Sequence, residues 1–252
     1  MKKIKQKFFD LLLLRKSWDI FSIIATILGL LLAFTGGIEG KNKILLGLNI
    51  AIIFTIIFVS IYIIMFLYSK FGIKEIKTKF GKANLTIKVG DLFKEEGLKV
   101  IPVNEYFDTQ VDDKVISSST LQGCFIKKYI DKDQKKMREL NSKISKELKN
   151  IQFENVKDRN CGKTKKYLIG TTILVDEYIL TALSKFNPQN EAYLSMPEYL
   201  EFLNKFWEEI NRIHNGRTVN VPVIGTGLAR INPTLSYQEY LEQIIFSLKT
   251  SS

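Results

Sequence analysis

Two long apolar runs near the start of the chain differ in pattern from everything that follows. The first spans Ile20–Ile38, the second spans Ile44–Tyr68, and neither contains a charged residue. Helices of these lengths reach about 28 and 37 Å, against roughly 30 Å for the hydrocarbon core of a bilayer. Residues 39–43 separate the two runs and are few enough for a tight turn. The pattern therefore predicts a two-helix transmembrane hairpin over residues 20–68.

From residue 84 onward, short strand-like runs alternate with amphipathic helical ones. The strand-like runs are 85–89, 98–103, 167–175, 178–183 and 219–224. The helical runs are 120–130, 134–148, 195–214 and 236–248. Ser195 with Glu198 forms a capping-box pattern at the start of one helix, and Ser236 with Glu239 forms another. Strands that alternate with helices predict an α/β domain with helices on both faces of its sheet.

Positive charge is concentrated beside the apolar runs. The 252 residues carry a formal net charge of +11, and residues 1–83 hold 13 Lys and Arg against four Asp and Glu. The flanking basic residues are Lys2, Lys3, Lys5, Lys7, Arg15 and Lys16 before the hairpin, and Lys70, Lys74, Lys77, Lys79 and Lys82 after it. The turn holds only Lys41 and Lys43. Because Lys and Arg favour the cytoplasmic side, both termini are predicted to be cytoplasmic.

These patterns divide the chain into four parts. They are a basic cytoplasmic N-terminal segment (1–19), the hairpin (20–68, with helices 20–38 and 44–68), a basic linker (69–83) and a cytosolic domain (84–252). The linker is read either as a continuation of the second helix or as a segment lying near anionic headgroups. The cytosolic domain is nearly neutral, with 24 Lys and Arg against 22 Asp and Glu, which argues against a nucleic-acid partner.

The most informative motif is a pair of glycines directly after a predicted strand. Its residues are Ile224, Gly225, Thr226, Gly227, Leu228, Ala229 and Arg230. Glycine lacks a Cβ, so the backbone N–H groups of such a loop can turn inward around a phosphate. The motif alone is also compatible with a simple tight turn. Arg230 suits a ligand phosphate and a surface ion pair equally well.

Two other strand ends carry polar groups suited to a nucleotide. Asp91 and Leu92 follow the run 85–89, and a carboxylate can accept a hydrogen bond from an adenine amino group. Val103 and Asn104 end the run 98–103, and an amide can both donate to and accept from ribose hydroxyls. Because ligands of open α/β sheets lie beyond the carboxyl ends of strands, the three strand ends form one candidate site.

In order and in strand context, these three motifs resemble the ADP-ribose-binding macrodomain family. The resemblance implies a macrodomain-like mixed sheet flanked by helices. It implies adenine at Asp91, the distal ribose at Asn104 and the diphosphate at the glycine loop. The segment bordering the distal end of the ligand would hold Ser117, Ser118, Thr120 and Gly123. The loop after Asn104 lacks the Gly-rich run of hydrolytic macrodomains, and no Gly-rich segment with paired glutamates is present, so no catalytic residue is expected.

The whole chain resembles the membrane effectors of type II Thoeris antiphage systems, the ThsA family. The stretches IPVNEYFDT, ISSSTLQGCFIKK, KKYLIGTTILVDEYILTALSKFN and VPVIGTGLARI carry this resemblance. It implies a multi-pass protein of the bacterial cell membrane that forms homo-oligomers. A TIR-domain partner would convert NAD into an ADP-ribose-derived signal, histidine-ADP-ribose. The macrodomain would bind it, and the membrane part would then disrupt the lipid bilayer and cause abortive infection.

Three classes of function follow from these features. The first is the nucleotide-gated membrane effector, which the intact glycine loop, Asp91 and Asn104 favour. The second is a membrane-anchored enzyme that hydrolyses or removes ADP-ribose, which the missing catalytic carboxylates disfavour. The third is an anchor whose macrodomain no longer binds a ligand. Cys124 and Cys161 alone cannot hold a metal cluster, and no metal is expected. No cofactor is expected besides the ADP-ribose-derived signal.

Overall fold

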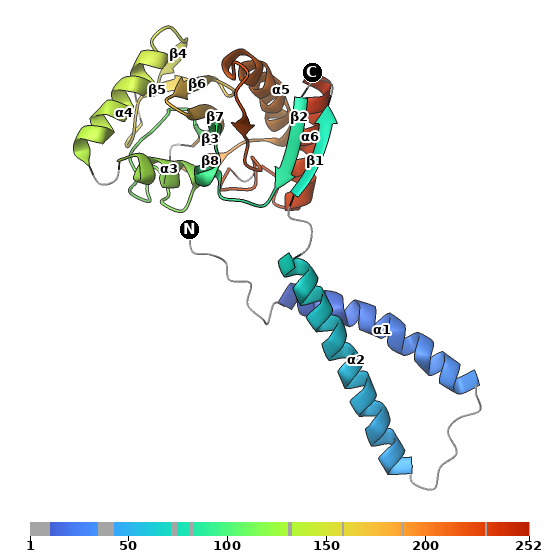
Figure 1. The fold of residues 1–252 in the computed structure, drawn as a ribbon. Coiled ribbons are helices and arrows are strands. Elements are labelled where there is room, and N and C mark those ends of the chain that lie inside the picture. The colour runs from blue at the N-terminus through green and yellow to red at the C-terminus, as the bar shows by residue number, and fades with distance from the viewer. Residues whose placement is uncertain are drawn as a thin grey trace. The chain divides into compact units, whose positions relative to one another are not determined.

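The computed structural model describes residues 11–34, 43–71, 75–80, 83–130, 133–157, 159–187, 189–229 and 231–251. Within these residues Figure 1 shows the helices and strands. The helices are α1 (Leu11–Phe34), α2 (Lys43–Phe71), the short 3-10 helix η1 (Leu92–Lys94), α3 (Leu121–Ile130), α4 (Gln134–Glu147), α5 (Met196–Ile213) and α6 (Tyr237–Ser251). The strands are β1 (Glu75–Phe80), β2 (Ala83–Lys88), β3 (Leu98–Asn104), β4 (Phe153–Asn155), β5 (Lys165–Tyr167), β6 (Thr172–Val175), β7 (Tyr178–Phe186), β8 (Ala192–Tyr193) and β9 (Val219–Asn220).

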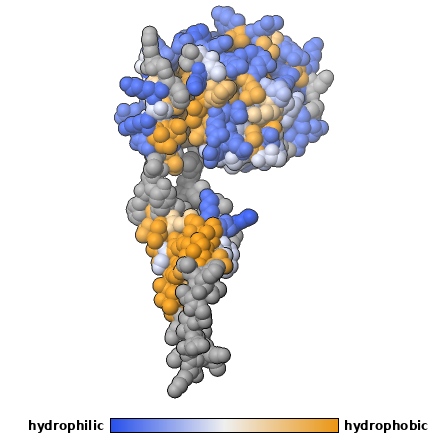
Figure 2. All heavy atoms as spheres, turned by 90° about the vertical axis from the view of Figure 1, so that its right-hand side faces the viewer, coloured by the Kyte–Doolittle hydropathy of each residue, from blue (hydrophilic) through white to orange (hydrophobic). Residues whose placement is uncertain are grey.

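The chain divides into two units, and the first contains the two long helices α1 and α2. The helices run antiparallel and contact each other through aromatic rings. The ring centre of Phe21 lies 6.0 Å from that of Phe54 and 5.4 Å from that of Phe58. Ser17 Oγ donates to Met65 Sδ at 3.5 Å. Large apolar side chains cover the outside of this helix pair, as Figure 2 shows.

One segment of the described chain, Ile50–Leu67, is long and apolar enough to cross a membrane. It lies in α2, within the predicted second span. The first predicted span falls partly in α1, and its residues 35–38 lie outside the described residues. Its crossing of a membrane therefore stays a prediction. The cytoplasmic orientation of both termini also stays a prediction, because residues 1–10 and the turn residues 39–42 lie outside the described part of the chain.

Helix α1 starts before the predicted first span 20–38. It begins at Leu11 and runs without interruption to Phe34, so it includes residues 11–19, which were assigned to the segment before the first span. Residues 11–13 are all leucine, and Leu is a strong helix former, so the helical segment extends toward the N-terminus.

The basic linker contains a strand that the sequence reading missed. Strand β1 pairs with β2 in a two-stranded sheet of its own. Ile76 and Thr78 alternate with Lys77 and Lys79, which is the period of two expected of a strand. The predicted strand 85–89 is present as β2, but its described partner is β1 rather than a strand of the main sheet.

The second unit is built on a mixed sheet with the order β6-β7-β3-β9, and β8 pairs with β7. Strands β3 and β7 are parallel, as are β3 and β9, whereas β6 and β8 run antiparallel to β7. This confirms the mixed α/β sheet. Strand β9 covers only Val219–Asn220 and is shorter than the predicted strand 219–224. Pro222 has no N–H to donate to a neighbouring strand, which explains the early end.

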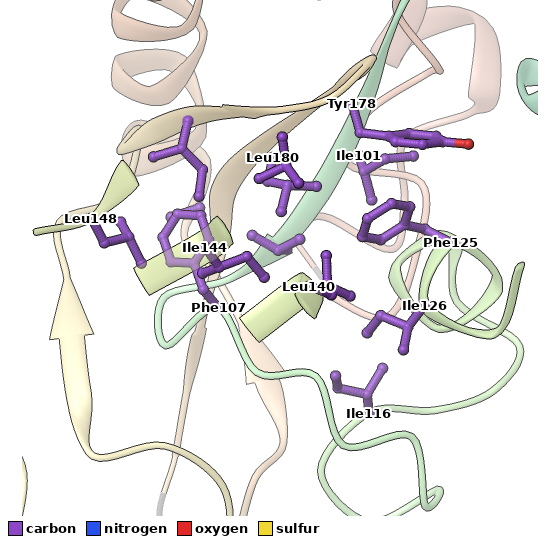
Figure 3. Packing of buried hydrophobic residues seen from close by; sticks show 14 of the residues in the cluster. Ile101, Phe107, Ile116, Phe125, Ile126, Leu140, Ile144, Leu148, Tyr178 and Leu180 are labelled. Carbon is purple, nitrogen blue, oxygen red and sulfur yellow. The ribbon is translucent and has the colours of Figure 1, made fainter. Parts of the chain in front are cut away.

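Helices cover both faces of this sheet, because side chains of β3 and β7 point alternately to opposite faces. Ile101 of β3 and Leu180 of β7 are neighbours in register and pack with α3 and α4, in the cluster of Figure 3. Val100 and Ile179 are also neighbours in register, but they pack with α5 and α6. Each face thus buries its own hydrophobic cluster, which holds the strand ends in fixed positions.

The helix caps predicted from sequence are present. Ser195 and Glu198 form a reciprocal capping box at the start of α5. At the start of α6, the Ser236 amide donates to Glu239 Oε2 at 2.7 Å, and the Glu239 amide donates to Ser236 Oγ at 3.3 Å. Helix α5 ends as expected, with Asn215 and Gly216 at φ angles of 44° and 75°.

Candidate functional site

Strands β3 and β9 are parallel neighbours, and both run toward the same edge of the main sheet, although β9 ends at Asn220, which is level with Lys99 near the start of β3. Asn104 ends β3, and the loop 224–229 follows β9 after three residues that form no strand. Ligands of open α/β sheets bind beyond this edge. Two of the three predicted strand ends thus follow parallel neighbouring strands that run in the same direction.

Asn104 closes the turn that follows β3. It is 1% exposed, and its Oδ1 accepts from the amides of Tyr106 at 3.0 Å and Asp108 at 3.3 Å. The backbone N–H of Asn104 donates to Gln122 Oε1 at 3.3 Å, which joins the turn to α3. Asn104 Nδ2 is the one buried side-chain polar atom of the described residues without a hydrogen-bond partner. An unpaired buried donor costs about 1–3 kcal/mol, so the side-chain Nδ2 of Asn104 would be stabilised by an oxygen of a ligand or of water that accepts its hydrogen bond.

The two glycines of the loop 224–229 have different surroundings. Gly225 has a φ of 101°, and a Cβ there would lie 2.9 Å from ring carbons of Tyr240. Gly227 has no atoms within 4 Å of a Cβ position. Tyr199 Oη donates to the Ile224 carbonyl at 2.8 Å and thereby holds the start of the loop. The positive φ of this loop is therefore at Gly225, and the open space lies at Gly227.

The remaining residues of this loop differ in exposure. Thr226 Oγ1 donates to the Val223 carbonyl at 3.0 Å. Leu228 is 52% exposed, whereas Ala229 is buried. Arg230, for which a phosphate contact and an ion pair were both considered, lies outside the described residues.

The segment that leads into α3 is held by its own hydrogen bonds, and Gln122 of α3 joins it to the turn after β3. The Ser117 carbonyl accepts from Thr120 Oγ1 at 2.7 Å, and Thr120 Oγ1 accepts from the Gly123 amide at 3.0 Å. The Ser118 amide donates to Asp113 Oδ1 at 2.6 Å. A Cβ on Gly123 would lie 2.3 Å from the Ser117 carbonyl oxygen, so only glycine permits this close packing.

Asp91 has a different local role from the one expected. Its Oδ1 accepts from the Phe93 amide at 3.2 Å, so the carboxylate caps the 3-10 helix η1. Leu92 packs against the hydrophobic cluster under α3 and α4. Within the described chain, no hydrogen bond joins Asp91 to Asn104 or to the loop 224–229. An adenine contact at Asp91 therefore stays a prediction.

A buried ion pair lies next to the β3 turn and was missed at the sequence level. Asp108 Oδ2 lies 2.7 Å from Arg159 Nη2, and the side chains of Asp108 and Arg159 are 1% and 4% exposed. The guanidinium also donates to Asn190 Oδ1 and lies 3.7 Å from the centre of the Tyr106 ring. The second carboxylate oxygen of Asp108 accepts from the Lys163 amide at 2.7 Å. Partners 51 residues apart give no local pattern that sequence reading could detect.

Burial changes the pKa values of two charged groups near this turn. Desolvation raises the pKa of the Glu105 carboxyl, although the Phe186 amide donates to Glu105 Oε1 at 3.0 Å and opposes the rise. Burial lowers the pKa of Lys163 to about 8, and nearby Asp108 opposes that shift. The Lys163 ammonium donates to the Phe107 carbonyl at 2.6 Å.

The acidic groups nearest the sheet edge already have protein partners. Asp108 pairs with Arg159, and Glu105 accepts from the Phe186 amide. Among the described residues, no group of three or more His, Cys, Asp and Glu side chains is placed to hold a metal ion. The edge therefore offers backbone amides, hydroxyls and an unpaired amide nitrogen, which are groups that bind polar ligands.

Comparison with known proteins identifies relatives over most of the chain. Residues 85–252 match the family model described as the Macro domain of the Thoeris protein ThsA. The Thoeris protein ThsA of Bacillus amyloliquefaciens (strain Y2) is 34% identical over 212 residues, which cover 82% of this chain and 67% of that relative. The similarity to this relative extends beyond the Macro domain, because the 212 aligned residues are more than residues 85–252 contain.

Proposed function

Because the chain belongs to the ThsA family of Thoeris defence proteins, we propose that it is a membrane effector with a nucleotide-sensing macrodomain. The signal is an ADP-ribose derivative, histidine-ADP-ribose, which a TIR-domain partner makes from NAD during phage infection. Binding activates the helical part of a homo-oligomer. The helices then disrupt the bacterial cell membrane and kill the cell or arrest its growth.

The observation that carries this proposal is the geometry of the loop 224–229. Gly225 adopts a φ of 101°, and Gly227 leaves open space where a side chain would otherwise stand. The loop follows β9, which runs parallel to β3, and ligands of open α/β sheets bind beyond the carboxyl ends of such strands. A loop with these properties can present backbone N–H groups to a diphosphate at close range.

Neighbouring groups supply contacts for the rest of such a ligand. The unpaired Nδ2 of Asn104 is a donor for a ribose oxygen once the turn opens to admit it. The hydroxyl groups of Ser117 and Ser118 lie in the half-buried segment before α3. They suit the polar conjugate at the distal end of ADP-ribose.

The membrane role rests on α1 and α2. The segment Ile50–Leu67 is one candidate span, and the ring contacts of Phe21 with Phe54 and Phe58 support a paired arrangement. We propose that both helices cross the membrane and that both termini are cytoplasmic. This orientation places the macrodomain where a cytosolic signal reaches it.

We propose that the macrodomain binds its ligand without turnover. Hydrolysis is accelerated by a general base that activates water, and a carboxylate is one such group. Glu105 and Asp108 are each about 2% exposed and are engaged by the Phe186 amide and Arg159. Neither carboxylate is available to a ligand at the sheet edge, which favours a sensor over the alternative of an ADP-ribose hydrolase.

Calorimetric titration of the full chain in detergent with ADP-ribose and with histidine-ADP-ribose tests the proposal. Gly227→Glu is expected to weaken binding by roughly a hundredfold, because like charges in contact cost several kcal/mol. The fold is expected to remain intact, since a Cβ at Gly227 meets no atom within 4 Å.

Gly227→Lys is the matched control, because it adds a long side chain of the opposite charge at the same position. It is expected to bind the anionic ligand more tightly than Gly227→Glu. Unchanged binding in a Gly227→Glu protein with the parent melting temperature would remove this loop from the site.

A further inference from the structure

A groove separate from the loop 224–229 lies between α4 and the hairpin formed by β4 and β5, which are neighbours in Figure 1. Its volume is about 490 Å³. Pockets for small molecules range over about 300–1,000 Å³. The lining residues are Tyr106, Ile144, Ser145, Leu148, Lys149, Phe153, Gly162, Lys163, Thr164, Lys165 and Tyr167. We call this the lysine–aromatic groove.

Aromatic rings form one part of this groove. Tyr106 and Tyr167 are 5% and 6% exposed and belong to its floor, whereas Phe153 is 39% exposed. The ring centres of Phe153 and Tyr167 are 6.0 Å apart. A large exposed ring next to a buried apolar floor offers a surface on which a flat ligand ring can stack.

Positive charge forms the other part. Three lysines line the groove, namely Lys149, Lys163 and Lys165, and the lining contains no Asp or Glu. Carboxylates close by are already paired. Glu154 lies 3.8 Å from Lys166, and Asp108 pairs with Arg159.

Two of these lysines occupy defined positions. The Lys165 ammonium lies 4.4 Å from the centre of the Phe153 ring, so charge and ring are adjacent. The Lys163 ammonium is anchored to the Phe107 carbonyl at 2.6 Å. Its pKa of about 8 leaves most of it protonated at neutral pH.

We propose that the lysine–aromatic groove is a second ligand site, which binds a nucleotide with its phosphates against the three lysines and its base against Phe153. A nucleotide combines the two features that the groove provides, because it carries several negative charges and a planar ring. The site shares no residue with the loop 224–229 and does not depend on the proposed function.

The groove is also connected to the turn after β3. The Tyr167 amide donates to the Glu105 carbonyl at 2.9 Å, and Tyr106 lies under the Arg159 guanidinium. A nucleotide in the groove therefore contacts residues whose neighbours close the turn at Asn104.

Titration of the full chain in detergent with ATP, tripolyphosphate and adenosine tests this assignment. ATP is expected to bind at least roughly tenfold more tightly than either fragment, because it alone presents both charge and ring. Equal affinity for ATP and tripolyphosphate would overturn the nucleotide assignment and leave an unspecific anion patch. No binding of ATP would overturn the site altogether.

The variant that isolates the groove is Lys149→Glu with Lys165→Glu, since both side chains are exposed. Its ATP affinity is expected to fall at least roughly tenfold at an unchanged melting temperature. The matched control is Lys135→Glu with Lys136→Glu, which makes the same charge change at exposed positions on α4 outside the groove. Equal losses in both double variants would contradict a specific site.

Gly227→Glu separates this proposal from the proposed function. ATP binding is expected to persist in that variant while ADP-ribose binding weakens roughly a hundredfold. If ATP binding is lost in Gly227→Glu and kept in the lysine double variant, ATP occupies the loop 224–229 and the groove assignment is wrong. Loss of ATP binding in the lysine double variant alone leaves the proposed function unaffected.

Discussion

At the scale of single residues, the two glycines of the sensing loop have different physical reasons to be glycine. Gly225 is needed by the fold, since its φ is 101° and the Tyr240 ring occupies the place of a Cβ. Gly227 has no atom within 4 Å of a Cβ position, so its lack of a side chain matters for the approach of a ligand and not for the packing of the fold. The sequence predicts a glycine loop after a strand, but it cannot assign these two roles, because they depend on a tyrosine 15 residues away.

Gly225→Ala is expected to destabilise the domain by about 1–3 kcal/mol, because alanine rarely adopts a positive φ and its Cβ would meet a buried ring. The Tyr240 ring is held in place, because its hydroxyl accepts from the backbone N–H of Asn232 and donates to the backbone carbonyl of Asn232. Urea unfolding followed by tryptophan fluorescence measures this change. Gly227→Ala is the control, expected to change stability by less than about 0.5 kcal/mol. Equal losses in both variants would contradict the assignment.

Glu105 gives the fold a pH dependence that can be measured. Its pKa is raised by burial above the value of 4.5 in an unfolded chain, so the folded state holds the proton more tightly. This contribution to stability is complete below the unfolded pKa of 4.5 and is lost as the pH rises through the raised pKa of the folded state. Glu105→Gln removes the titration and can keep an acceptor for the Phe186 amide.

The glutamine variant is therefore expected to gain stability relative to the parent as the pH rises from about 4 to 7. Each unit of pKa difference corresponds to about 1.4 kcal/mol. Urea denaturation of both proteins at several pH values provides the comparison. A stability difference that stays constant over this range, or that shrinks as the pH rises, would show that the buried carboxyl does not titrate as described.

At the scale of elements, local signals predicted most helices, and long-range contacts determined the rest. The capping box at Ser195 and the cap at Ser236 mark their helices because the partners are three residues apart. Strand β1 was missed because its lysines suggested a linker, although Ile76 and Thr78 alternate correctly. Only residues 81–82 separate β1 from β2, so their pairing is local in the sequence, and it was missed together with β1.

The Asp108–Arg159 pair joins elements that are far apart in the chain. It connects the turn after β3 to the loop before β5, and through Asn190 to the loop after β7. Removing one partner of a buried pair leaves an uncompensated charge, which costs about 3–5 kcal/mol.

Arg159→Leu is therefore expected to destabilise the domain by about 3–5 kcal/mol. The double variant Asp108→Leu with Arg159→Leu is expected to lose less than the sum of the two single variants, because neither charge is then left unpaired. A double-mutant cycle from urea denaturation gives the coupling energy. Additive losses would show that the two side chains do not depend on each other.

At the scale of the whole molecule, the sequence predicted the family, the α/β class and the long helices. The family is confirmed by the match over residues 85–252 and by the similarity to the Bacillus amyloliquefaciens relative. The lysine–aromatic groove was not predicted, since Tyr106, Lys149 and Phe153 converge only after the chain has folded. The consequence of ligand binding for the membrane helices is a property of both units together, and it requires a functional measurement.

The most direct measurement is dye release from liposomes that contain the purified full chain. Addition of histidine-ADP-ribose is expected to release the dye from liposomes with the parent protein, and to release none from those with Gly227→Glu. Equal insertion of both proteins is verified by their recovery with the liposome fraction. Equal release with and without ligand, or ligand-dependent release in Gly227→Glu, would contradict the account that nucleotide binding at this loop triggers membrane disruption.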